Sequence, residues 1–183
     1  MFRLSRSFAA IFVALAVLIA QAAAADSVAV DLQGKVVFMR HAYAPGNGDP
    51  MQFKLGDCST QRNLNDEGRE QARLTGKKLR ERSIVFSQVY SSEWCRCRET
   101  AAMLDMGEAV PFVGLNSFYD HYFSEAELIP LLQEKLRTVQ PTDGPILMVT
   151  HFVTIAAITG KAVSSGDLVI YDPATGSAEI FKP

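Results

Sequence analysis

Short apolar runs, rich in β-branched and aromatic residues, recur along the chain and predict β-strands. The first three runs are apolar at successive positions instead of alternating with polar residues, a pattern typical of strands covered on both faces. A turn-rich segment, residues 172–176, separates the last two runs and predicts a hairpin. The expected strands are residues 35–39, 88–90, 146–150, 168–171 and 178–181.

Amphipathic segments between these runs predict helices. Asn65 is the expected N-cap of the first, which has acidic residues in its first turn and Lys and Arg residues at its end, the order that the helix dipole favours. A narrow stripe on this helix would let it lie close to a sheet; it consists of Ala72, Thr75, Gly76 and Leu79. Strands that alternate with helices predict an α/β fold with a mainly parallel sheet. Residues 98–105 are expected to begin a second helix, and residues 151–159 to form another. A helix is also expected over residues 125–139, with an apolar face of Leu128, Leu131, Leu132, Leu136 and Val139.

Residues 1–25 resemble a secretory signal. Arg3 and Arg6 give a positive start, an apolar run of 13 residues follows over 8–20, and residues 23–25 are the small residues at which a signal peptidase cleaves. The run is shorter than the roughly 20 residues of a membrane span; an uncleaved N-terminal anchor is the alternative. We expect cleavage after Ala25, a mature domain of residues 26–183 and a periplasmic or secreted location.

Removal of this leader would shorten the chain and make its net charge more negative. The mature chain would have 158 residues (183 minus 25), enough for one domain with a core, and losing Arg3 and Arg6 would move the formal charge from −2 to −4. A mildly acidic protein has no general attraction to nucleic acid or anionic membranes. We therefore expect no nucleic-acid partner and no stable membrane association after cleavage, and any anion site must be built locally. The sequence leaves the oligomeric state open.

Three cysteines, Cys58, Cys95 and Cys97, favour one disulfide in an exported protein. Cys95 and Cys97 are too close in sequence to pair comfortably, so Cys58 is expected to pair with one of them. A zinc site built from all three is the alternative, although a C-x-C spacing is shorter than structural zinc sites use. Thiol catalysis of the tyrosine-phosphatase kind is excluded, because it needs an Arg six positions after a Cys, and those positions hold Leu64, Ala101 and Met103.

Polar and charged residues follow the three strongest strand candidates. In open α/β sheets, ligands bind outside the carboxyl ends of the strands, so parallel neighbours would bring these residues into one crevice. Forked guanidinium groups grip phosphate oxygens, and an imidazole can act as nucleophile or donor, so the set suits a phosphate group. The residues are Arg40 and His41 after the first strand, Ser91, Ser92 and Arg96 after the second, and His151 after the third.

Four stretches of the chain resemble the motifs of the histidine phosphatase superfamily, which also contains the phosphoglycerate mutases. They occur in the family's order and with its approximate spacing, over residues 35 to about 160, and Ala42 stands where the family has Gly. The stretches are FMRHA at 38–42, LNDEGREQA at 64–72, SSEWCRCRETA at 91–101 and VTH at 149–151. The resemblance, to a small exported bacterial branch, implies a phosphoglycerate mutase-like, three-layer α/β/α sandwich.

The resemblance also implies roles for individual residues. His41 matches the nucleophile that becomes a phosphohistidine, and Arg40, Arg96 and His151 match the phosphate-holding residues. Asn47 lies where some members place a further polar contact. The other ring nitrogen of His41 is expected to donate to a backbone carbonyl, leaving a neutral nucleophilic nitrogen, and His151, if protonated, would add a third cationic donor. No metal or cofactor is implied, and the expected partner is a small phosphorylated substrate.

The proton donor for the leaving group is open at this stage. Phe152 follows His151, which disfavours the branch whose acid comes directly after the second His. Asp120 is the candidate, with Glu125 behind it, although members that cleave phosphoramidate bonds can lack a dedicated acid. Arg98 lies off the motif position and is expected to be a solvated helix residue.

Other functions remain open. A catalytically weak or inactive phosphate-binding module of the same fold is the main alternative. The intact set of His41, Arg40, Arg96 and His151 argues against it, whereas the substitution of Ala42 for Gly counts in its favour. A phosphoglycerate mutase is disfavoured by export and by the short region between the motifs. Envelope sugar phosphates, as in heptose phosphatases that share the fold, are one possible substrate class, and the sequence does not choose among substrates.

Overall fold

The structure, a computed structural model, describes residues 30–183; the expected leader and its cleavage point after Ala25 lie outside the described residues. Six strands form one sheet in the order β3-β2-β4-β1-β5-β6. β4 pairs in parallel with both β1 and β2, and β2 in parallel with β3, whereas β5 and β6 add an antiparallel edge. The strands are β1 Val36–Arg40, β2 Gln88–Ser91, β3 Ala109–Pro111, β4 Ile146–Thr150, β5 Leu168–Tyr171 and β6 Ala178–Phe181.

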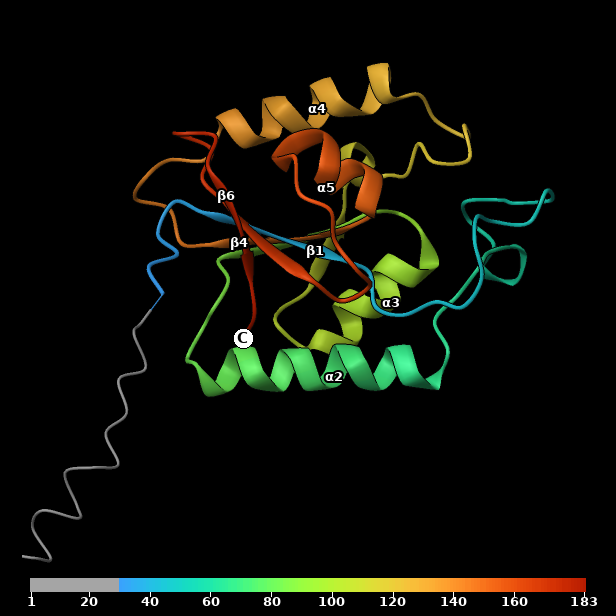
Figure 1. Ribbon diagram of the computed structural model, residues 1–183, viewed down its shortest axis with the longest axis horizontal. Helices are drawn as coiled ribbons and strands as arrows, with labels where there is room; N and C mark the ends of the chain where they lie inside the picture. The colour runs from blue at the N-terminus through green and yellow to red at the C-terminus, as the bar shows by residue number, and fades with distance from the viewer. Residues whose placement is uncertain (1–29) are drawn as a thin grey trace, which may run out of the picture. The chain divides into compact units, whose positions relative to one another are not determined.

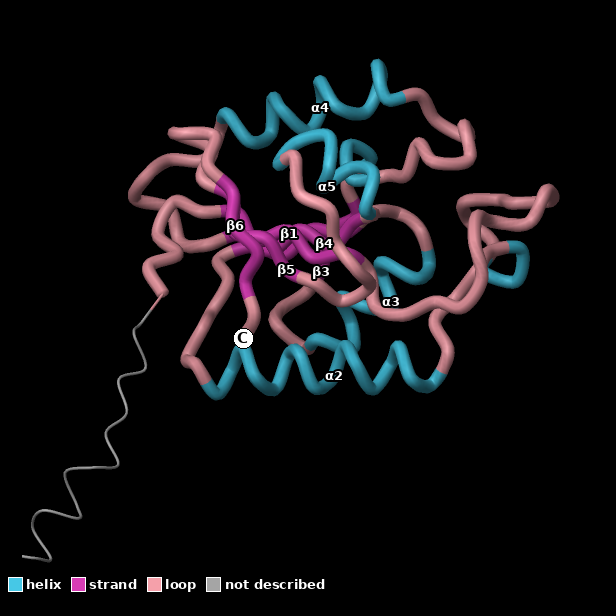
Figure 2. Tube along the Cα trace, in the orientation of Figure 1, coloured by secondary structure: helices cyan, strands magenta, loops and turns pink. Residues whose placement is uncertain are grey.

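Helices cover both faces of this sheet, which confirms the three-layer α/β/α sandwich (Figure 1). α2 and α3 lie on one face, and α4 and α5 lie on the other, with the strands between them (Figure 2). The helices are α2 Asp66–Glu81, α3 Cys95–Leu104, α4 Glu125–Arg137 and α5 Phe152–Thr159, with short 3-10 turns η1 Cys58–Thr60 and η2 Val113–Leu115.

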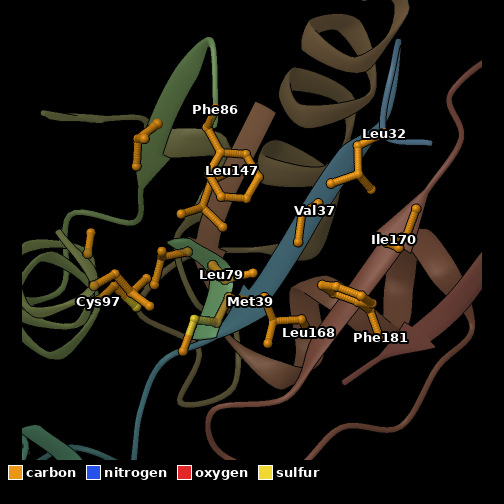
Figure 3. Close-up of a cluster of buried hydrophobic side chains, with 14 of the residues drawn as sticks. Leu32, Val37, Met39, Leu79, Phe86, Cys97, Leu147, Leu168, Ile170 and Phe181 are labelled. Atoms are coloured by element: carbon orange, nitrogen blue, oxygen red, sulfur yellow. The ribbon is translucent and has the colours of Figure 1, made fainter. Parts of the chain in front are cut away.

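Two apolar clusters hold the layers together, one on each face of the sheet. Because successive side chains of a strand point to opposite faces, Val37 of β1 joins one cluster and Phe38 joins the other. Figure 3 shows the first cluster, in which Val37, Leu147 and Leu79 lie between the sheet and α2. Burial on both faces explains the unbroken apolar runs of β1 and β4, which are buried at almost every position.

Helix α2 begins as the sequence predicts. The Asn65 side chain accepts a hydrogen bond from the Gly68 backbone N–H at 2.9 Å, so Asn65 is its N-cap. The small-residue stripe contacts more than the sheet: Leu79 packs in the cluster with β1 and β4, whereas Gly76 meets helix α3, and Gly68, one turn before the stripe, meets the loop after β1. A Cβ atom at Gly68 would collide with the carbonyl of Tyr43, and one at Gly76 would collide with the carbonyl of Leu104. These glycines therefore allow α2 to approach both segments at backbone distance.

Some predicted elements differ from the structure. β3 was not predicted because it has three residues and ends at Pro111, as suits an edge strand. α3 begins at Cys95, three residues before the predicted start, because its N-cap residue, Trp94, makes no side-chain capping bond that a sequence pattern could indicate. Leu131 was placed on the buried face of α4 but is 42% exposed, and α4 ends at Arg137, before the predicted limit. None of the helices within residues 30–183 is long and apolar enough to cross a membrane.

Candidate active site

The ends of three parallel strands bring the predicted residues together. In the register of β1 and β4, Arg40 is paired with Thr150, so the next residues, His41 and His151, lie side by side. The His41 backbone N–H extends the ladder by donating to the Thr150 carbonyl at 2.9 Å, and the two ring centroids are 5.5 Å apart. Both histidines are 2% exposed. The carboxyl ends of β1 and β4 therefore bring a buried pair of imidazoles together, as the sequence predicts.

His41 is oriented by its own neighbour. Its Nδ1 lies 2.8 Å from the carbonyl oxygen of Ala42, and since a carbonyl only accepts, Nδ1 carries the proton. The pKa of His41 is held well below its usual value by burial and then by the charge of Arg96, with smaller effects from Arg62 and Arg40. The ring is therefore neutral at neutral pH, with a lone pair on Nε2, as a nucleophile requires.

His151 is held by side chains of the segment that follows β2. Its Nε2 is 2.9 Å from Ser92 Oγ, which donates in turn to Asn116 Oδ1 at 3.1 Å, so His151 Nε2–H can donate to the serine. Burial, Arg96 and His41 hold the pKa of His151 well below its usual value. His151 is therefore neutral at neutral pH. It would act as a third cationic donor only if it became protonated.

Arg40 and Arg96 each have an unused buried donor. The Nε atoms of both guanidiniums are buried and have no acceptor within residues 30–183. Arg40 Nη1 donates to the carbonyl of Val163 at 2.8 Å, and Arg96 Nη1 is bound to a carboxylate, so each guanidinium is fixed by one edge. Buried donors without partners are costly. A bound anion would satisfy both.

Asp49 is a buried residue of the site that the sequence did not indicate. Its side chain is 1% exposed, and its two oxygens accept from Arg96 Nη1 at 2.9 and 3.0 Å. The indole N–H of Trp94 and the backbone N–H of Arg62 also donate to this carboxylate, each at 2.9 Å. Asp49 therefore fixes the Arg96 guanidinium, which belongs to the third motif, and offsets its charge.

Arg62 is a third guanidinium near the histidines that the sequence did not indicate. Its Nε donates to the carbonyl of Gly48 at 2.8 Å, and its Nη1 donates to that of Ala44 at 2.6 Å. Its pKa is lowered by burial and by the charge of Arg96, whereas Asp49 raises it. Arg62 precedes the second motif in a segment without periodicity, so no pattern singled it out.

The other residues that the sequence analysis considered lie in loops or on helix surfaces. Asn47 is exposed, makes no side-chain hydrogen bond within the described part of the chain, and its role stays a prediction. The Asp120 carboxylate accepts the backbone N–H of Asp49 at 2.9 Å, which places Asp120 beside the loop that carries Asp49. Glu125 is exposed in the first turn of α4, and Arg98 is exposed on α3.

A disulfide joins Cys58 to Cys95, the residue before Arg96, and Cys97 is free. Because two of the three sulfurs are bonded to each other, the alternative zinc site is not formed, and no group of three or more metal-ligating side chains occurs within residues 30–183. The Cys97 thiol lies 3.5 Å from His151 Nε2, and burial raises its pKa to about 12. Cys97 is thus protonated and poorly nucleophilic.

Comparison with protein families shows which family this chain belongs to. The model of the histidine phosphatase superfamily, branch 1, matches residues 36–135, more than half of the chain. The chain belongs to the histidine phosphatase superfamily. The matched range contains His41, Arg40 and Arg96 and ends before His151, which the sheet nevertheless brings to His41. Family membership supports phosphatase activity in general terms.

Solved structures of histidine phosphatases share the fold at low sequence identity. The protein histidine phosphatase SixA complexed with tungstate has a TM-score of 0.59 and 16% identity, over 81% of this chain and 94% of that one. A phosphoserine phosphatase from Entamoeba histolytica in complex with phosphoserine has a TM-score of 0.58 and 15% identity, over 81% and 95%. Phosphoglycerate mutase from Plasmodium falciparum has a TM-score of 0.50 and 18% identity, over 81% and 88%, in keeping with the predicted mutase-like fold. No curated protein sequence matches.

Proposed function

We propose that this protein is an exported, metal-independent phosphatase that hydrolyses phosphate monoesters or phosphoramidates through a phosphohistidine on His41. The observation that carries the proposal is the arrangement around His41: a neutral imidazole with Nδ1 bound to Ala42 and Nε2 free, beside guanidiniums whose buried Nε donors have no acceptor. Cationic donors around a nucleophile suit phosphoryl transfer, which depends on positioning and charge stabilisation.

In the first step, His41 Nε2 attacks phosphorus in line with the leaving oxygen or nitrogen. The P–N bond to His41 forms as the bond to the leaving group breaks, and the leaving group takes up a proton. Arg40 and Arg96 hold the phosphoryl oxygens, and a bound dianion favours the protonated form of His151, which then donates as well. In the second step water attacks phosphorus as the P–N bond to His41 breaks, the proton of the water returns to the group that protonated the leaving group, and phosphate leaves with His41 neutral again.

Asp120 is the proposed proton donor to the leaving group, with Glu125 as the second candidate. Asp120 is half-buried in the loop that follows Asn116 and is tied to the Asp49 backbone. Glu125 is exposed at the start of α4. A phosphoramidate substrate would need neither, since members of this family that cleave such bonds can lack a dedicated acid.

One observation favours the alternative, a phosphate-binding module of the same fold with little or no catalysis. Asp49 already occupies one edge of Arg96, so part of the charge available to a phosphate is offset. The free Nε of Arg96 and the charges of Arg40 and Arg62 weigh against this reading, because net positive charge is left for a ligand.

Export is proposed from the N-terminal sequence and is supported by the disulfide. Bonds such as Cys58–Cys95 persist in oxidising compartments and are rare in the cytosol. We expect the protein to be periplasmic or secreted after cleavage at Ala25. Amino-terminal sequencing of protein recovered from the extracytoplasmic fraction tests this. Protein that still begins at Met1 and is found in the cytoplasmic fraction would refute it.

The experiment for the activity is phosphate release by residues 26–183, with chelator present, from a panel of phosphate monoesters and phosphohistidine. The comparison is between His41→Asn and His121→Asn, because His121 is the third histidine and is exposed. We expect wild type and His121→Asn to be active and His41→Asn to be inactive. Equal release by all three would refute the nucleophile, and phosphate binding without turnover on any substrate would favour the binding module.

A further inference from the structure

Two partly exposed aromatic rings lie next to Arg40, one of the guanidiniums of the candidate site. Phe152 follows His151 and is 37% exposed, and Tyr119 is 50% exposed. Their ring centroids are 5.4 Å apart in an edge-to-face arrangement, and the Arg40 guanidinium carbon lies 5.1 Å from the centre of the Phe152 ring. The two rings therefore form a continuous aromatic wall that begins at Arg40, one of the proposed phosphate-binding residues.

The protein holds this wall in place instead of burying it. Phe152 is the first residue of α5, and Arg40 stacks on its ring. Tyr119 lies in a loop whose next residue, Asp120, accepts the backbone N–H of Asp49, the residue that fixes Arg96. The loop that carries the wall is thus hydrogen-bonded to the segment that orients the phosphate site.

A second row of rings runs from the same loop to His151. The Tyr122 hydroxyl donates to the carbonyl of Pro50 at 3.0 Å, and its ring lies 4.4 Å from that of Phe53. Phe53 stacks on Trp94 at 5.0 Å, and Trp94 contacts His151 edge-on at 5.3 Å. Aromatic groups therefore line this end of the loop. Asp120 is the acidic residue between its two tyrosines.

We propose that Phe152 and Tyr119 form the subsite for the leaving group, and that the substrate is the phosphate ester or phosphoramidate of a planar aromatic or heteroaromatic group. This inference rests on the proposed function. With the phosphoryl group held by Arg40, the group attached to it meets the adjacent rings, and aromatic pairs prefer offset or edge contacts at 4.5–7 Å.

Competitive inhibition by two matched phosphonates tests the subsite. Benzylphosphonate and cyclohexylmethylphosphonate have the same number of carbon atoms, but only the first is planar. Each inhibition constant is divided by that of inorganic phosphate, which has no leaving group. We expect benzylphosphonate to bind about three- to tenfold more tightly than its partner, the advantage expected of one or two aromatic contacts.

Variants of the wall complete the test. Phe152→Leu combined with Tyr119→Leu is expected to bring the ratio between the two phosphonates close to one, whereas Phe152→Tyr keeps the ring and is expected to retain the preference. The same variants should lower kcat/KM for an aryl phosphate more than for a fluoroalkyl phosphate of matched leaving-group pKa. If wild type binds inorganic phosphate but has no preference for the planar ring, or if the leucine variants keep the preference, this inference is wrong while the proposed function stands. If inorganic phosphate itself does not bind, the proposed function fails and this inference fails with it.

Discussion

The Asp49 carboxylate and the Arg96 guanidinium form a buried ion pair beside the two histidines. The side chains are 1% and 3% exposed, and Arg96 Nη1 lies 2.9 and 3.0 Å from the two carboxylate oxygens. The pair connects the loop after β1 to the first turn of α3. It leaves Arg96 Nε for a ligand while the opposite edge of the guanidinium is held.

Asp49→Asn tests the importance of this pair. The variant loses the charge and at least one of the four hydrogen bonds that the carboxylate accepts, and breaking a buried pair by removing one partner costs about 3–5 kcal/mol. We expect the free energy of unfolding in urea to fall by an amount of this order and kcat/KM to fall with it. Glu70→Gln, in the exposed pair with Arg73, is the control and should change neither. A stable, fully active Asp49→Asn protein would show that the pair does not position Arg96.

Asp120→Asn separates a proton donor from a structural loop residue. The amide oxygen of the variant can still accept the Asp49 backbone N–H, so the loop should be kept. If Asp120 protonates the leaving group, kcat for an alkyl phosphate should fall roughly 10²- to 10⁴-fold, the range typical of general acid catalysis. A substrate with an acidic leaving group should be affected far less. Equal losses on both substrates would assign Asp120 to structure instead.

The Cys58–Cys95 disulfide should stabilise the fold and the phosphate site together. It closes a loop across a sequence separation of 37 residues, for which chain entropy predicts about 2–4 kcal/mol. We expect reductant to lower the urea midpoint and to weaken binding of inorganic phosphate, because Arg96 directly follows Cys95. Reductant should have no further effect on Cys58→Ser. Labelling of denatured, unreduced protein should detect one thiol, that of Cys97; three thiols would exclude the bridge.

The buried histidines predict that stability falls at mildly acidic pH. Burial and the charge of Arg96 hold the pKa of His41 and of His151 well below its usual value in the folded state, whereas the unfolded chain titrates near about 6.5. Below about 6.5 the unfolded state binds more protons, so this stabilisation is complete above that pH and is lost as the pH falls. We expect a lower free energy of unfolding at about pH 5.5 than at pH 7.5, and a smaller difference in His41→Asn. An identical pH dependence in both proteins would contradict the neutral, buried state of His41.

The sequence predicts the sheet and the pairing of the histidines because both depend on local patterns. Apolar runs with β-forming residues locate the five longer strands, and parallel neighbours bring the residues at their ends together. His41 and His151 therefore meet although 110 positions separate them (151 minus 41). The short edge strand β3 has too few residues for such a pattern.

Asp49 and Arg62 could not be predicted in the same way. Both lie in the irregular segment between the first two motifs, where no periodicity indicates which side chains point inward. Their positions depend on tertiary contacts: Trp94 and Arg96 bind Asp49 from α3 and its N-cap, and the carbonyls of Ala44 and Gly48 bind Arg62. Predicting these contacts requires the conformation of the loop. The only indication in the sequence that the loop is fastened to α3 was the expected pairing of Cys58 with Cys95 or Cys97.

Trapping the phosphorylated enzyme tests the central claim most directly. Protein mixed briefly with an aryl phosphate is quenched in denaturant at alkaline pH, where phosphohistidine survives, and then digested and mapped by mass spectrometry. The account predicts one phosphorylated residue, His41, whose label is lost on acid treatment, is absent from His41→Asn and is retained in His121→Asn. An active protein that carries no label, or carries it on a residue other than His41, would contradict the account.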